Sequence, residues 1–97
     1  PGHALAAAQQ DGFGAMVTFE VADERAAAAL VDGLEHFCLA ESLGGVESLA
    51  NHPAVMTHAS IPPARRAELG ISDDLVRLSV GVEDLADLQL DLEHALG

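Results

Sequence analysis

Arg77 lies inside the apolar segment LVRLSV (75–80), and it has the clearest potential for chemistry in this chain. Side chains alternate along a strand, so Val76 and Leu78 point to one face and Arg77 points to the other. If helices pack on the first face, a ligand or another domain is expected to cover the second. A guanidinium group binds a carboxylate through two parallel hydrogen bonds, which favours a carboxylate ligand here. The alternative is a salt bridge to one of the sixteen acidic residues of the chain.

A second candidate is the turn formed by Ser42, Leu43, Gly44 and Gly45. Paired glycines permit positive φ angles and the close approach of another backbone or a ligand. The alternative is a tight connection between two short strands. Glu41 directly precedes the turn and is a candidate for a pocket that binds an ammonium group, although a single glutamate is usually just solvated.

The histidines and the cysteine give no pattern for catalysis or metal binding. Thr57 and His58 form a suggestive pair, but no acid or nucleophile stands at a fixed spacing from them. His52, His58 and Cys38 lack the short paired spacings of zinc sites, so no metal is expected. Cys38 has apolar neighbours on both sides and is expected to be a small core residue.

The charge of the chain argues against several classes of partner. Four arginines and no lysine stand against sixteen acidic residues, which gives a formal net charge of −12. Phosphate backbones and anionic lipids attract Lys and Arg, so neither nucleic-acid nor membrane binding is expected. No apolar run approaches the roughly 20 residues of a membrane span, and the start of the chain lacks a signal pattern. A single cysteine fits a reducing compartment, so we expect a cytoplasmic protein.

The hydrophobic pattern predicts one small domain with an aliphatic core. Helices are predicted over 1–11, 24–36, 60–69 and 84–96, and strands over 14–21, 37–40, 46–50 and 75–80. This order favours an α+β fold with a mostly antiparallel sheet and helices packed on one side.

Several residues carry local expectations within these elements. Asp23 is predicted to cap the helix over 24–36, and Gly70 to end the helix over 60–69 in a left-handed conformation. Gly33 suggests close packing of its helix on the sheet. In the last helix, Leu85 is expected in the buried stripe and Asp91 mostly in water.

The motifs SLGGVESL, HPAVMTHASIP and LVRLSVGVED, taken together and in this order, closely resemble a known family. They are similar to the C-terminal part of the Cys/Met-metabolism pyridoxal-phosphate enzymes, which include cystathionine γ-synthase, cystathionine lyases and homoserine sulfhydrylases. The resemblance covers essentially residues 1–97. It implies the small C-terminal domain of a fold-type I pyridoxal-phosphate enzyme, which binds substrate in sulfur amino-acid metabolism.

The resemblance also implies roles for individual residues. Arg77 matches the arginine that binds the α-carboxylate of the amino-acid substrate. Ser42 matches the serine beside the cofactor-bearing lysine, and Leu43 shares in positioning the substrate and that lysine. Thr57 matches a residue near the arginine. Glu41 matches a position that is acidic in members acting on cystathionine, which favours γ-replacement or γ-elimination on cystathionine or a homoserine ester.

One departure from the family is large: this chain has neither lysine nor tyrosine. Family members hold pyridoxal phosphate as a Schiff base on a lysine of a larger domain. The chain alone is therefore expected to be inactive and to bind no cofactor. The Pro1-Gly2 start is expected to reflect truncation of a longer enzyme, whose large cofactor-binding domain is the partner and which the resemblance implies is a homotetramer. The alternative is a free-standing amino-acid-binding or assembly module.

Overall fold

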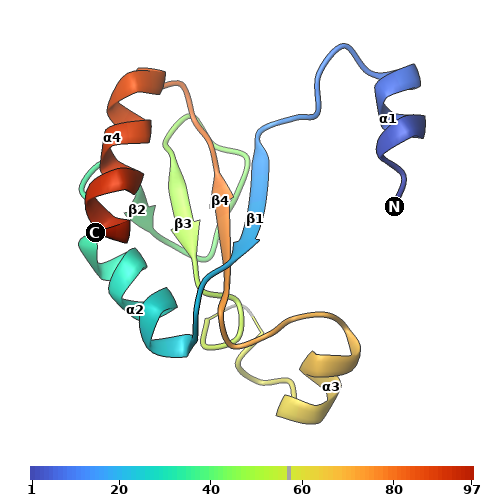
Figure 1. Cartoon of the computed structure of the whole chain (residues 1–97), viewed down its shortest axis with the longest axis vertical. Helices are drawn as coiled ribbons and strands as arrows, with labels where there is room; N and C mark the ends of the chain where they lie inside the picture. Colours follow the sequence, from blue (N-terminus) through green and yellow to red (C-terminus); the bar gives the residue numbers. More distant parts are fainter. Residues whose placement is uncertain (57) are drawn as a thin grey trace.

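A computed structural model describes residues 1–56 and 58–97, and in that part of the chain four strands form one sheet (Figure 1). The elements in chain order are α1 (His3–Gln9), β1 (Met16–Glu20), α2 (Glu24–Gly33), β2 (Cys38–Leu39), β3 (Leu49–Asn51), α3 (Pro63–Glu68), β4 (Leu75–Ser79) and α4 (Leu85–Leu96). Each matches a predicted segment in type. Most are shorter than predicted, because only residues with complete hydrogen-bond partners extend a helix or a ladder.

The sheet is mixed, and the prediction of a mostly antiparallel sheet is wrong. Its strand order is β1-β4-β3-β2, with β4 antiparallel to both β1 and β3. The short β2 instead runs parallel to β3. The double glycine therefore does not join two strands in a tight turn. Residues 40–48 form a longer loop, since the chain must travel back before it can enter β3 in the same direction.

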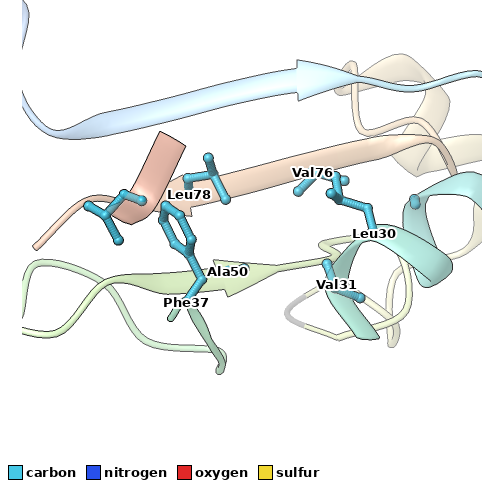
Figure 2. Packing of buried hydrophobic residues seen from close by; sticks show 8 residues of the cluster. Leu30, Val31, Phe37, Ala50, Val76 and Leu78 are labelled. Atoms are coloured by element: carbon cyan, nitrogen blue, oxygen red, sulfur yellow. The ribbon is translucent and has the colours of Figure 1, made fainter. Parts of the chain in front are cut away.

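The core lies between the sheet and the two longer helices, α2 and α4. Figure 2 shows its side chains gathering between α2 and the strands β3 and β4. The predicted alternation along β4 is confirmed, because Val76 and Leu78 are buried in this cluster. Full burial of a side chain of this size contributes about 1.5–3 kcal/mol. The cluster consists of Ala27, Leu30, Val31, Phe37, Ala50, Val76, Leu78 and Leu88.

Helix α2 begins as predicted, because the Asp23 carboxylate accepts a hydrogen bond from the backbone N–H of Ala26 at 2.8 Å. It ends at Gly33, three residues early, since the following segment takes its hydrogen bonds from α4. The Asp91 carboxylate accepts from the backbone N–H groups of residues 35, 36 and 37 at 2.6, 2.8 and 3.0 Å. Asp91 is only 3% exposed, so its predicted place in water is wrong.

Two further predictions for the helices are corrected by how α2 meets α4. The two helices meet near their C-terminal ends, where Gly33 of α2 lies against Ala95 of α4 (Figure 1). Leu85, at the other end of α4, lies away from α2 and is 66% exposed rather than buried. Gly33 faces Ala95 of α4, where an added Cβ would lie 3.5 Å from its Cα and Cβ, and not the sheet.

Helices α1 and α3 stand outside this layer, so only α2 and α4 form the predicted one-sided cover. Neither α1 nor α3 has a buried residue, and Figure 1 draws α1 apart from the sheet. The end of α3 is nevertheless as predicted. Gly70 adopts φ 79°, and N–H groups of Gly70 and Ile71 return to the carbonyls of Ala67 and Arg66. This pair of hydrogen bonds is a Schellman motif. Among the described residues, no helix has the length and apolar character to cross a bilayer.

Candidate functional site

Arg77 lies at the centre of β4, on the face of the sheet opposite to the core. Its neighbours across the ladders are Thr18 of β1 and Asn51 of β3. The Nη2 group donates to the backbone carbonyls of Glu41 and Ser42 at 3.2 and 3.4 Å. In residues 1–56 and 58–97, no carboxylate forms an ion pair with it, so the salt-bridge alternative is not realised there. The guanidinium is thus oriented by neutral acceptors and keeps its positive charge available.

Within the loop between β2 and β3, residues 41–48, called the 41–48 loop from here on, bring most of the predicted site residues to Arg77. Gly44 adopts φ 78°, a left-handed conformation that favours glycine, and its N–H donates to Ser79 Oγ at 2.8 Å. Glu41, Ser42 and Leu43 are all exposed at the start of this loop. Thr57, the remaining predicted site residue, lies outside the described residues.

The end of the loop crosses the chain just beyond β4 at very short range. Gly81 is required there, because a Cβ would overlap the carbonyl oxygen of Val46 and lie 2.7 Å from the nitrogen of Ser48. The N–H of Gly81 donates to Ser48 Oγ at 2.8 Å, and that hydroxyl donates to Glu83 at 2.5 Å. The N–H of Ser48 also donates to both oxygens of Glu83, at 2.8 and 3.1 Å.

These hydrogen bonds make Glu83 a stable carboxylate. The hydroxyl and then the backbone N–H of Ser48 hold the pKa of Glu83 below its ordinary value of 4.5, against a smaller opposing effect of desolvation. Glu83 therefore carries a negative charge at neutral pH and accepts hydrogen bonds from the loop continuously.

Ser48, Ser79, Gly81 and Glu83 were missed as site residues by the sequence analysis. Ser79 could have been found, because period-two alternation places it on the same face as Arg77. Glu83 carried a signal with a different meaning, since an acid before a helix suits the helix dipole. Gly81 and Ser48 showed no signal in the sequence, because their contact joins segments about thirty residues apart.

The other polar candidates do not join this site. His52 is buried, and its Nε2 lies 2.6 Å from the carbonyl oxygen of Asp73. Cys38 is exposed, so the prediction of a core residue is wrong; it lies in β2 at the edge of the sheet. Within the described ranges, no group of three or more His, Cys, Asp or Glu side chains could hold a metal ion.

The comparison with protein families decides the affiliation. Residues 1–97 match the family described as Cys/Met metabolism PLP-dependent enzyme. The chain belongs to this family. The predicted resemblance is thereby confirmed, over the whole of the sequence.

Individual family members show how much of an enzyme this chain represents. The chain is 57% identical over 96 residues to a cystathionine beta-lyase of Lactococcus lactis and 54% identical over 96 residues to a cystathionine gamma-lyase of Bacillus subtilis. Each match covers 99% of this chain and 25% of the relative. A crystal structure of cystathionine gamma synthase from Xanthomonas oryzae pv. oryzae, in complex with cystathionine, has 61% identity and a TM-score of 0.90. That match covers 99% of this chain and 25% of the synthase chain. The chain therefore spans about a quarter of the length of its relatives.

The residues of this chain do not fit the covalent attachment of pyridoxal phosphate. Attachment requires a lysine amine, and all four basic residues are arginines. The family name implies the cofactor for the full-length relatives. In this part of such an enzyme, the site around Arg77 can bind and orient an anionic group, but it offers no amine to hold the cofactor.

Proposed function

We propose that these 97 residues are the small C-terminal domain of a PLP-dependent enzyme of sulfur amino-acid metabolism, and that Arg77 binds the α-carboxylate of its amino-acid substrate. The observation that carries the proposal is the state of the guanidinium. It lies on the face away from the core, Nη2 is occupied by the two carbonyls of Glu41 and Ser42, and the described residues supply no carboxylate.

The geometry suits one carboxylate at this place. Because the carbonyls fix Nη2, the planar guanidinium is oriented before a ligand arrives, and its other N–H groups can form parallel hydrogen bonds. A substrate fixed at its carboxylate keeps the rest of its atoms in a defined position, which is how a binding group increases the rate of a reaction.

The residues around Arg77 have proposed roles in the same site. Ser42 and Leu43 shape the pocket at the start of the loop and, in the full enzyme, help to position the substrate and the cofactor-bearing lysine. Thr57 is proposed to lie near the arginine. Glu41 is exposed beside it and is a suitable acceptor for an ammonium group of a substrate such as cystathionine.

The proposed reaction is γ-replacement or γ-elimination on cystathionine or a homoserine ester. The support is of two kinds. Glu41 provides a negative charge near the carboxylate site, and the relatives are named as enzymes of cystathionine metabolism. The relatives carry three different reaction names at comparable identity, so the acidic residue, and not similarity, is the basis for this choice.

The partner in the proposal is the large cofactor-binding domain of the same enzyme. It would cover the face that carries Arg77, where Leu43, Val46 and Val82 are 54, 70 and 81% exposed. Apolar surface of this kind usually marks an interaction site. We further propose a homotetrameric, cytoplasmic parent enzyme, and that the chain alone is inactive and binds no pyridoxal phosphate.

Arg77→Ala in the full-length protein tests the function. Removing one partner of a hydrogen-bonded charge pair costs about 2–5 kcal/mol, so kcat/KM for L-cystathionine or an O-acyl-L-homoserine should fall by roughly 30-fold to several thousand-fold. Arg77→Lys should recover only part of this loss, because an ammonium group lacks the two parallel donors.

Arg65→Ala is the matched control. Arg65 is an exposed arginine of α3 whose partner is Glu68 at 2.8 Å, and exposed pairs of this type contribute little. Its kcat/KM should stay near that of the unmodified protein. A loss of only about twofold in Arg77→Ala would contradict the assignment of the carboxylate to Arg77, since a removed charge pair costs far more.

A further inference from the structure

The 41–48 loop is attached to the open face of the sheet by polar contacts that follow β4 and the residues after it. They advance together along both segments, so the loop runs beside the second half of β4 and the residues that follow it. The contacts join Glu41 and Ser42 to Arg77, Gly44 to Ser79, Val46 to Val82 and Ser48 to Glu83.

Apolar packing does not hold this loop. Leu43 and Val46 are 54 and 70% exposed, whereas the side chains that receive or bridge its hydrogen bonds, Ser48 and Ser79, are 0 and 2% exposed. A buried hydroxyl that loses its hydrogen-bond partner destabilises the protein. The bound position of the loop is therefore favoured over positions in which these hydroxyls lack a partner. The position of the loop therefore depends on a few acceptors, chiefly the Ser79 hydroxyl and the Glu83 carboxylate.

The loop in turn orients Arg77. Its guanidinium has long, exposed contacts with two loop carbonyls, at 3.2 and 3.4 Å. If the loop moved away from β4, these carbonyls would no longer define the direction of Nη2. The arginine would keep its charge but would sample several rotamers, and a ligand would have to select one of them.

We propose that Ser79 and Glu83 are positioning residues for carboxylate binding: they hold the 41–48 loop on β4, and the loop carbonyls orient the guanidinium of Arg77. This inference rests on the proposed function, because it assumes that Arg77 binds the substrate carboxylate. Neither residue touches the substrate in this proposal. Both act through the loop.

The test uses the full-length enzyme with Ser79→Ala and, separately, Glu83→Gln, assayed with L-cystathionine and with an O-acyl-L-homoserine. Each variant removes a hydrogen bond that positions the loop, so KM should rise about five- to tenfold while kcat stays within about twofold. A purely structural role would instead reduce the amount of active enzyme, which lowers the apparent kcat and leaves KM unchanged.

A double-mutant cycle connects the effect to Arg77. In the Arg77→Ala background, Ser79→Ala should raise KM no further, since the group that it positions is gone. Asp84→Ala is the matched control. Its carboxylate also accepts from a backbone N–H, that of Ala86 at 2.9 Å, but it caps α4 and does not contact the loop. It should leave KM unchanged.

The outcomes separate this inference from the function on which it rests. If Arg77→Ala raises KM but Ser79→Ala and Glu83→Gln do not, the positioning role is wrong and the carboxylate assignment stands. If Ser79→Ala raised KM by the same factor with and without Arg77→Ala, the positioning role would also be wrong. If Arg77→Ala itself lowers kcat/KM by no more than about twofold, the proposed function is wrong, and this inference is wrong with it.

Discussion

The two faces of the sheet are covered in different ways. On one face, α2 and α4 bury an apolar cluster, and the Asp91 carboxylate holds the segment that follows α2. On the other face, the 41–48 loop lies on β4 through hydrogen bonds and leaves its apolar side chains exposed. The stability of the helix face should therefore respond to changes of buried volume and to loss of the buried Asp91 carboxylate. The loop face should respond to changes of hydrogen-bond geometry and backbone clearance.

Asp91→Ala should have the largest effect on stability. It leaves the N–H groups of residues 35–37 without their acceptor in a partly buried place, at a cost of about 3 kcal/mol. Hydrogen exchange of peptides covering residues 34–40 in the full-length protein should become more than about 100-fold faster. Asp87→Ala, an exposed acid of the same helix, should change exchange little. If residues 34–40 exchanged equally fast in Asp91→Ala and Asp87→Ala, the buried Asp91 carboxylate would contribute no more to stability than an exposed one.

Gly81→Ala should destabilise the loop face by about 2 kcal/mol, since an added methyl group must displace backbone. The Cβ would meet the carbonyl of Val46 and the nitrogen of Ser48, neither of which can rotate away. We expect faster hydrogen exchange over residues 42–48 with little change over residues 27–37. Gly45→Ala is the control within the same loop, because its Cβ would have no neighbour closer than 4.0 Å. If hydrogen exchange over residues 42–48 were unchanged in Gly81→Ala, the loop would have room for a methyl group at position 81.

Acid should weaken the two faces through different carboxylates. The pKa of Asp91 is lowered below 3.8: burial raises it, but the three backbone N–H groups together with His36 outweigh burial. The pKa of Glu83 is lowered below 4.5. Because the folded state binds protons less readily than the unfolded state, both contributions are fully present above about pH 5 and are lost as pH falls through each folded pKa.

Hydrogen exchange, corrected for its intrinsic pH dependence, can follow the two faces separately. Between pH 5.5 and 3, protection of residues 46–48 should fall in the unmodified protein and become nearly independent of pH in Glu83→Gln. Protection of residues 35–37 should keep its pH dependence in that variant. Loss of pH dependence at both places in Glu83→Gln would mean that the faces do not open independently.

Local signals explain what the sequence predicted correctly. Period two along β4 identified Val76 and Leu78 as core, and Asp23 and Gly70 were recognised as helix ends because capping depends on residues three or four apart. The same alternation brought attention to Arg77. Its neighbours in the 41–48 loop were predicted as site residues from the glycine pair and from the family resemblance.

The errors concern contacts between distant segments. The carboxylate of Asp91 binds backbone about 55 residues away, and no spacing rule distinguishes such an acid from one in water. The parallel pairing of β2 with β3 depends on the path of the loop between them, which periodicity does not encode. The requirement for glycine at 81 depends on where that loop crosses. The sequence therefore predicted the elements and the face of the sheet on which Arg77 lies, but not the contacts that hold the loop in place.

Gly33→Ala should have the smallest effect, and it is expected to be stabilising. Gly33 ends α2 without a positive φ, and an added Cβ would lie 3.5 Å from Ala95, an ordinary van der Waals distance. Replacing a compatible glycine by alanine stabilises by about 0.5 kcal/mol, because the unfolded chain loses freedom. Exchange of residues 27–33 should slow by about twofold, whereas KM should not change. A loss of stability in Gly33→Ala comparable to that in Gly81→Ala would show that both faces are limited by backbone clearance, and the contrast between packing and hydrogen bonding would fail.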